Sequence, residues 1–427
     1  MNSSKAKITF FCFLLFLLAA AFQMPETQQN PASFTSGEWQ YIIVGDTVQI
    51  TGYTGFSRVV EIPAELDHYP VTVIGEDVFR DRTEIQRVRF PDSVETIGPA
   101  AFLGCTSLEE VIFGSGLTQI QMEAFRYCES LKEISFPLSL MTIGTAAFEG
   151  CTGLQTLLLP DSVIAVSSSA FQYCSNLSDI TFSRNLRTLG ENAFDSTPWL
   201  EAQTDEFVFV GNWILLKYNG NDPVVTVPIQ TTAIVDAFMN HITLEEVILP
   251  RTLTEIGGNA FNGCLNLKSI DIPETVISIG NYAFQGCRTL KEVVLPKSLK
   301  TIGINAFHEC TSLETIELPA GVKNIHSRQF AFCPALTRFA IPATVDSIHD
   351  IAFENSNNIT FEVVYGTLGE EYAKEKMIPY TYLIEKNADF TFRRSEEGIE
   401  IISYLGQLYE VRVPDFIEDL PVWKIGP

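Results

Sequence analysis

The chain has 427 residues, is 46% hydrophobic, and carries 28 Lys and Arg against 52 Asp and Glu, a formal charge of −24. This length allows two or three ordinary domains or one long repeat array, and the apolar content excludes global disorder. So acidic a surface repels phosphate backbones and anionic lipid headgroups, which excludes nucleic acid as a partner.

The first element expected along the chain is a signal peptide over residues 1–21. Lys5 and Lys7 precede an apolar run from Ile8 to Ala21, and its alanine-rich end offers a cleavage site. The run is shorter than the roughly 20 apolar residues of a spanning helix, although an uncleaved anchor is the alternative. We therefore expect a secreted or cell-surface protein with no membrane insertion beyond this segment.

A polar linker is expected over residues 22–37, followed by a β cap over residues 38–75. The cap segment alternates apolar and polar positions, as half-buried strands do, and contains the turn-rich stretch from Thr51 to Gly55. A cap is needed because the end of a repeat array exposes its core.

A 23-residue repeat follows in two blocks, 76–194 and 237–357. Its clearest mark is a phenylalanine in register, with a gap of 44 residues between the blocks. The phenylalanines are Phe79, Phe102, Phe125, Phe148, Phe171, Phe194, Phe238, Phe261, Phe284, Phe307, Phe330 and Phe353. A unit this short cannot bury its own apolar stripe, so neighbouring units must stack and share one core.

The chemistry of one unit indicates its conformation. Val293 and Leu295 alternate inward on a short strand, and Pro296 ends the strand's hydrogen bonding because it lacks an N–H. Gly303 permits a corner, and Phe307 is the core plug of the helical turn that follows. The pattern predicts a β-solenoid, a leucine-rich-repeat array of 23-residue coils with short strands and short helical turns.

The unit I-G-x-x-A-F-x-x-C-x-x-L-x-x-I-x-L-P resembles the BspA-like leucine-rich repeat family, over roughly Tyr41 to Tyr382. The resemblance implies an extracytoplasmic or cell-surface protein of a microbe, and some members are linked to adhesion to host matrix proteins and to other cells. It also implies a C-terminal cap over residues 358–385, where Leu368 to Lys376 is expected to be a short helix. Those functions map onto no defined residues, so no site is carried over.

Residues 195–236 break the period between the two blocks. The stretch from Phe207 to Leu216 is predicted to form two strands around a Gly-Asn turn, and we expect a β-hairpin that projects from the array.

Residues 390–427 restart the N-terminal cap. Tyr404 and Pro421 repeat Tyr53 and Pro70 at an offset of 351 residues. We therefore expect either a fragment of a longer protein or a chain that has lost a downstream array.

Eight of the nine cysteines occupy one slot of the repeat, three residues after the phenylalanine. They are Cys105, Cys128, Cys151, Cys174, Cys264, Cys287, Cys310 and Cys333. Secretion and an even count favour disulfides, whereas the shared slot favours a stack of buried thiols in a small apolar position. Stacking brings neighbouring cysteines within disulfide range, so pairing stays open, but reduced and buried thiols are the prediction.

The sequence offers little chemistry for metal binding or catalysis. His326 and His349 are 23 residues apart and should stack near Asp346 and Asp350. Two ligands and a carboxylate are a weak metal signal, so neither a metal nor another cofactor is predicted. The sequence contains no G-x-S-x-G motif, phosphate loop or supported nucleophile–base set, so we expect a protein that is not an enzyme. A hydrolase built around the insertion is the least favoured alternative.

The candidate binding site is the outward face of the strands. Side chains alternate along a strand, so the two positions that flank the inward residue face solvent. The candidate residues are Glu110, Ile112, Leu158, Glu246, Ile248, Asp271, Glu292 and Val294, with Trp213 and Tyr218 on the hairpin. Exposed aliphatic residues on a charged surface suit a protein or glycan partner, although ordinary strand composition is the alternative. We therefore expect a binding module such as an adhesin, and a structural spacer or truncated remnant stays open.

Overall fold

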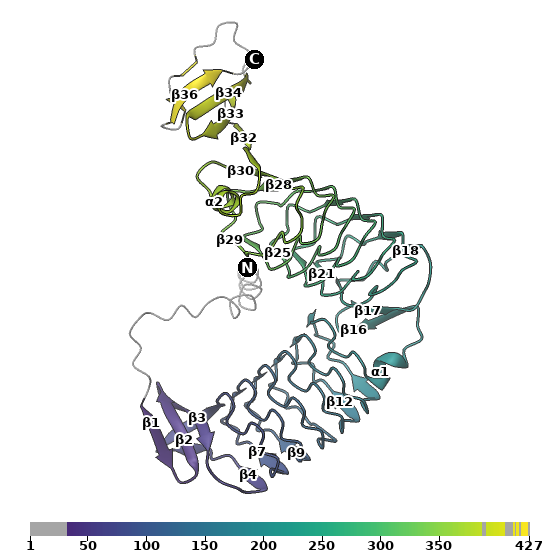
Figure 1. Ribbon diagram of the computed structural model, residues 1–427. Helices are drawn as coiled ribbons and strands as arrows, with labels where there is room; N and C mark the ends of the chain where they lie inside the picture. Colours follow the sequence, from purple (N-terminus) through teal and green to yellow (C-terminus); the bar gives the residue numbers. More distant parts are fainter. Residues whose placement is uncertain (1–31, 387–389, 406–412, 415, 418–419, 426–427) are drawn as a thin grey trace, which may run out of the picture.

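The computed structural model describes residues 32–386, 390–405, 413–414, 416–417 and 420–425. Within them the chain is a curved β-solenoid, which confirms the predicted leucine-rich-repeat array (Figure 1). The predicted signal peptide, residues 1–21, lies outside the described residues. In the part of the chain that the structure describes, no helix is both long enough and apolar enough to cross a membrane.

A twisted sheet closes the N-terminal end of the solenoid. Its strands are β1 (Ser33–Ser36), β2 (Trp39–Val44), β3 (Thr47–Tyr53), β5 (Glu65–Leu66) and β6 (Tyr69–Ile74). Strand β4 (Val59–Glu61) pairs instead with β7 (Arg87–Arg89) of the array. Strands β1 to β3 are antiparallel, and β6 runs parallel to β3 and to β8 (Thr96–Ile97) of the array. Tyr41, Ile50 and Ile74 are fully buried, so the sheet covers the open end of the core.

Most coils contribute one strand to a parallel ladder that we call the ribbon. The ribbon strands of the array are β7 (Arg87–Arg89), β9 (Glu110–Ile112), β12 (Thr156–Leu158), β14 (Asp179–Thr181), β18 (Val224–Thr226), β20 (Glu246–Ile248), β22 (Ser269–Asp271), β24 (Glu292–Val294), β26 (Thr315–Ile316), β28 (Arg338–Ile341) and β30 (Thr360–Val363). In most of them only the middle residue is buried, as the alternation predicts.

A second ladder is built from two-residue strands. They are β8 (Thr96–Ile97), β10 (Gln119–Ile120), β11 (Thr142–Ile143), β13 (Ala165–Val166), β15 (Thr188–Leu189), β19 (Ala233–Ile234), β21 (Glu255–Ile256), β23 (Ser278–Ile279), β25 (Thr301–Ile302), β27 (Asn324–Ile325) and β29 (Ser347–Ile348). In Figure 1, β7, β9 and β12 lie on the outer side of the arc, and β21, β25 and β29 lie on its inner side.

The corner after the second ladder needs glycine for a different reason from the predicted one. Gly303 is absent from the residues with positive φ, and the left-handed position comes two residues later, at Asn305 (φ 55°). A Cβ atom on Gly303 would lie 2.5 Å from the backbone nitrogen of Asn281 in the preceding coil. Close approach of stacked coils, rather than backbone freedom, therefore excludes a side chain there.

The phenylalanines stack through the core as predicted. The rings of Phe102 and Phe125 are 5.1 Å apart and those of Phe284 and Phe307 are 5.3 Å apart, with interplanar angles of 4° and 6°. All four side chains are fully buried. The core divides into one apolar cluster for each block.

The insertion joins the two blocks instead of projecting from them. Strands β16 (Phe207–Val210) and β17 (Ile214–Tyr218) form the predicted antiparallel pair, but β17 also runs parallel to β19 and continues the second ladder. Ile214 and Leu216 pack into the core of the first block, and Leu215 packs into the core of the second. A strand buried on both faces has a continuous apolar run, which explains the Ile-Leu-Leu sequence. The prediction of a projecting hairpin is therefore wrong.

A short helix caps the last coil. The helix α2 (Leu368–Glu375) forms where it was predicted and buries Tyr372 and Ala373 against the array. It is followed by β31 (Tyr380–Tyr382), which pairs with β30.

The C-terminal module has the topology of the N-terminal sheet. Its strands are β32 (Ile384–Lys386), β33 (Phe390–Ser395), β34 (Gly398–Tyr404), β35 (Phe416–Ile417) and β36 (Leu420–Ile425). The strand order β32-β33-β34-β36, with β35 on β36, repeats the order β1-β2-β3-β6, with β5 on β6. The register shift between Thr391 and Phe392 has its counterpart between Gln40 and Tyr41.

Candidate functional site

The ribbon of the second block is a continuous parallel sheet. Strands β18, β20, β22, β24 and β26 pair in register, so that Glu246, Ser269 and Glu292 are direct neighbours across the strands. The inward residues Val247 and Val293 anchor this sheet in the core. The outward residues are therefore held on a rigid support.

Four of the predicted binding residues line one shallow groove on this ribbon. The groove has a volume of about 420 Å³, and Glu246, Ile248, Asp271 and Val294 are part of its wall. Ile248 is 49% exposed and Val294 is 64% exposed. Apolar side chains that are this open, between carboxylates, form a surface on which a partner could bury area.

The carboxylates of this ribbon are unpaired. Within the described ranges, no hydrogen bond or ion pair is recorded for the side chain of Glu246, Asp271 or Glu292, although Glu245 just beside them binds Lys268 at 2.6 Å. At the two ends of the ribbon the acids are neutralised, because Arg87 pairs with Glu110 and Arg338 pairs with Glu362. Among the described residues, unpaired ribbon acids thus lie between these two ends, namely Glu246, Asp271 and Glu292 in the second block and Glu133 and Asp179 in the first.

The predicted residues of the first block do not join this groove. Glu110 is paired with Arg87, while Ile112 and Leu158 are exposed on separate short sheets of the ribbon. No strand forms over residues 133–135, so the ladder of the first block is interrupted there.

The predicted hairpin residues also lie away from the groove. Trp213 is 48% exposed at the turn between β16 and β17, but those strands belong to the sheet of the second ladder. Tyr218 is only 5% exposed, and its ring lies 5.2 Å from that of Phe238 and 5.0 Å from that of His241. The prediction that Tyr218 contacts a partner is wrong, because β17 turns this residue into the core of the second block.

The cysteine slot is buried and also contains a hydrogen bond. All eight repeat cysteines are buried free thiols. Each Sγ donates to the backbone carbonyl of the phenylalanine in the preceding coil, at 3.1 Å from Cys105 to Phe79 and 3.0 Å from Cys264 to Phe238. Burial raises the pKa of both thiols to about 12, so they stay protonated donors.

Serine at the same slot makes the same bond. The hydroxyl of Ser356 donates to the carbonyl of Phe330 at 2.7 Å. Where the slot holds cysteine or Ser356, a small side chain thus donates to the preceding coil, a bond that packing arguments from sequence did not identify. Thr197 donates instead to Phe194 of its own coil, and His241 stands at the slot after Phe238.

The two stacked histidines are not part of a larger ligand cluster. His326 has its pKa lowered by burial and by the neighbouring His349. The carboxylate of Asp350 binds Lys376 at 3.2 Å. Among the residues that the structure describes, no group of three or more His, Cys, Asp or Glu side chains is placed to hold a metal ion.

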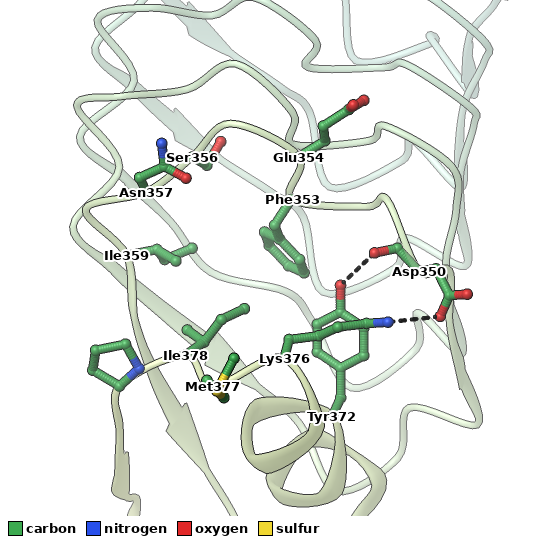
Figure 2. A pocket seen from close by; sticks show the side chains of 11 residues that line it. Asp350, Phe353, Glu354, Ser356, Asn357, Ile359, Tyr372, Lys376, Met377 and Ile378 are labelled. Atoms are coloured by element: carbon green, nitrogen blue, oxygen red, sulfur yellow. Dashed lines mark hydrogen bonds and ion pairs between the residues drawn. The ribbon is translucent and has the colours of Figure 1, made fainter.

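A cavity of about 320 Å³ separates the last coil from the capping helix α2 (Figure 2). Across it, Lys376 reaches the carboxylate of Asp350, and the hydroxyl of Tyr372 donates to the carbonyl of Asp350 at 3.2 Å. Burial raises the pKa of Tyr372 to about 12, so its hydroxyl stays protonated. These contacts fasten the helix to the coil, and they provide no activated nucleophile.

A group of acids at the joint between the blocks was missed by the sequence analysis. Asp236 accepts hydrogen bonds from the backbone of Asn192 at 2.7 Å and from the side chain of Asn259 at 3.1 Å. Burial, with a smaller contribution from the charge of Glu191, raises the pKa of Asp236 and of Glu255 to about 7. These carboxyl groups become adjacent only when the two blocks meet, so no local motif announces them.

Comparisons with known proteins agree with the repeat pattern. The sequence matches the family described as BspA type Leucine rich repeat region, in six copies, over residues 96–206 and 232–360. A leucine rich cell surface protein from Faecalibacterium prausnitzii is 27% identical, with 81% of this chain and 98% of that chain covered and a TM-score of 0.36. A leucine-rich repeat protein from Bacteroides ovatus is 25% identical, with 82% and 99% covered and a TM-score of 0.34.

The pneumococcal vaccine antigen PcpA is 23% identical, with 84% of this chain and 100% of that chain covered and a TM-score of 0.41. No curated protein matches the chain.

Proposed function

Because the chain belongs to the BspA-type leucine-rich repeat family, we propose that it is a non-enzymatic binding protein that presents the ribbon of its second block to a protein or glycan partner. The observation that carries this proposal is the groove, in which unpaired carboxylates alternate with exposed aliphatic side chains.

The physical support for binding is the rigidity of this surface. Each outward side chain projects from a strand that is hydrogen-bonded on both sides and anchored by a buried neighbour. A partner that docks there orders few flexible groups, so less of its contact energy is lost to entropy. An exposed Val294 or Ile248 contributes only when a partner removes it from water.

The proposed location is outside the cytoplasm, secreted or at the cell surface. The support is the sequence of residues 1–21, with two lysines before an apolar run, together with the cell-surface location that the family resemblance implies. Adhesion to a host or to another cell would be the consequence of such a position.

The test is a binding survey with matched charge variants. The purified protein would be screened against immobilised matrix proteins and glycans, beside the variant Glu246→Lys, Asp271→Lys, Glu292→Lys. The control variant, Glu129→Lys, Glu133→Lys, Asp179→Lys, makes the same change in charge at exposed acids of the first block.

We expect at least one partner whose binding is lost in the first variant and kept in the control, while circular dichroism shows both to be folded. Binding that is equal in wild type and both variants would place the site elsewhere.

A further inference from the structure

The outward residues of four consecutive coils alternate in chemistry. Two coils pair an acid with an aliphatic residue, and the coil that follows each of them pairs a hydroxyl residue with an acid. In chain order the pairs are Glu246 and Ile248, Ser269 and Asp271, Glu292 and Val294, and Thr315 and Glu317. All eight residues are exposed.

This alternation gives the ribbon two regular spacings. One carboxylate occurs in every coil, and neighbouring parallel strands are about 4.8 Å apart. The carboxylates alternate between the two outward positions, before the inward residue at Glu246 and Glu292 and after it at Asp271 and Glu317. An aliphatic side chain occurs in every second coil, at about 10 Å. Two lysines flank this face, Lys268 and Lys291, of which Lys268 binds Glu245, and neither forms an ion pair with a ribbon carboxylate among the described residues.

The spacing discriminates between possible shapes of a partner. An α-helix rises 5.4 Å per turn, so one residue per turn keeps pace with one coil, and over three coils the mismatch is only about 2 Å. An extended chain places side chains of one face about 6.7 Å apart, and over the same distance its mismatch grows to about 6 Å. The wall of the groove has no aromatic ring on which a sugar could stack, which favours a protein partner.

We infer that the second-block ribbon is a docking surface for a basic amphipathic α-helix of a partner protein, laid along the array. This inference rests on the proposed function and specifies its partner. One Lys or Arg per turn, alternately on the two sides of the helix, would reach the carboxylates from Glu246 to Glu317, and apolar residues at positions i and i+7 would cover Ile248 and Val294. The chain's charge of −24 attracts such a helix and steers its approach.

The two kinds of contact have separable signatures. Exposed ion pairs are individually weak and are screened by salt, so they govern the rate of association and its salt dependence. The contacts to Ile248 and Val294 persist at high salt because they depend on apolar area. Only a ligand that contacts the carboxylates and the two aliphatic side chains at the same time should bind tightly.

Two isomeric peptides test the inference. Each has about 18 residues, five helical turns, of Leu and Lys in equal proportion. One follows a helical period and the other alternates strictly, as a strand does. Fluorescence anisotropy with the labelled peptides should show the helical isomer binding wild type about tenfold more tightly or better. The variant Glu246→Lys, Asp271→Lys, Glu292→Lys should bind the helical isomer about tenfold more weakly or worse, while the affinity of the first-block control stays within about twofold of wild type.

A second variant tests the apolar row without changing charge. Ile248→Ser with Val294→Ser should weaken the helical isomer several-fold and should weaken it equally at low and at high salt. If both isomers bind wild type equally, the interaction is unspecific charge attraction and the inference is wrong. If neither peptide binds wild type, but a matrix protein binds wild type and does not bind the charge variant, the helix inference is wrong and the proposed function stands. If every partner found in the survey binds the charge variant as tightly as it binds wild type, the proposed function is wrong, and the helix inference that rests on it is wrong as well.

Discussion

The two blocks of the array share one unit but not one surface. In both, phenylalanines stack and thiols donate to carbonyls of the preceding coil, for example from Cys151 to Phe125 and from Cys287 to Phe261. On the ribbon they differ, since the first block is interrupted at residues 133–135, whereas the second is a continuous sheet from β18 to β26 on which acids alternate with exposed aliphatic residues. Positions that packing dictates are the same in both blocks, and positions free of packing are where the blocks diverge. That divergence is where recognition can be encoded.

The largest expected effect tests whether the two cores are equivalent. Phe148→Ala and Phe284→Ala each remove a ring that lies between two others, at 5.2 Å on either side of Phe148 and at 5.4 and 5.3 Å from the neighbours of Phe284. Each should lower the free energy of unfolding by about 3–5 kcal/mol. Urea denaturation measures this, and a large loss in only one block would show that the blocks are not built alike.

The joint between the blocks predicts a pH dependence. In the folded state Asp236 and Glu255 have pKa values raised to about 7, from ordinary values of 3.8 and 4.5. Between about pH 4 and pH 7 the folded state therefore binds more protons than the unfolded chain, so stability falls as pH rises through this window. Since one pKa unit corresponds to about 1.4 kcal/mol, the loss should be on the order of a few kcal/mol.

Urea denaturation between pH 5 and pH 8 measures this loss. The variant Asp236→Asn with Glu255→Gln should flatten the profile, because neither replacement ionises. An equally steep profile in that variant would assign the pH dependence to other groups.

A smaller effect is expected at the thiol slots. Cys151→Ser and Cys287→Ser should each cost about 1 kcal/mol, because a serine hydroxyl can make the bond that Ser356 makes. The two costs should be alike, as the blocks have the same slot. In the native wild type, a thiol reagent should modify none of the eight repeat cysteines, and all should react in denaturant; rapid native labelling would contradict their burial.

The smallest effect on stability is expected on the ribbon itself. The variant Glu246→Lys, Asp271→Lys, Glu292→Lys should change the free energy of unfolding by no more than about 0.5 kcal/mol, because these side chains are exposed and, among the described residues, form no hydrogen bond or ion pair. Thermal unfolding measures it. A large destabilisation would mean that these acids support the fold.

The sequence was sufficient for the parts of the fold that repeat. The phenylalanine register predicted the stack, and the strand alternation predicted that Ile248 and Val294 are exposed. It failed at the insertion, where Leu215 and Tyr218 face one block while Ile214 faces the other. The apolar run Ile214–Leu216 is compatible both with a projecting hairpin and with a strand buried on both faces. The only sign of the buried strand was that apolar and polar residues do not alternate in this run. The acids at the joint escaped because Glu191 and Asp236 are brought together by tertiary packing.

Transfer of the ribbon pattern to the first block tests most directly whether outward chemistry, and not the shared core, determines binding. Glu133, Thr156 and Asp179 already supply acid, hydroxyl and acid in three first-block coils. The substitutions Ser135→Ile, Leu158→Asp and Thr181→Val would complete the alternation there.

These three substitutions would be made in the variant that carries lysine at 246, 271 and 292, and the affinity for the helical Leu-Lys peptide would be measured. We predict that binding returns to within about tenfold of wild type. A folded protein that still fails to bind the peptide, while wild type binds it, would contradict the account.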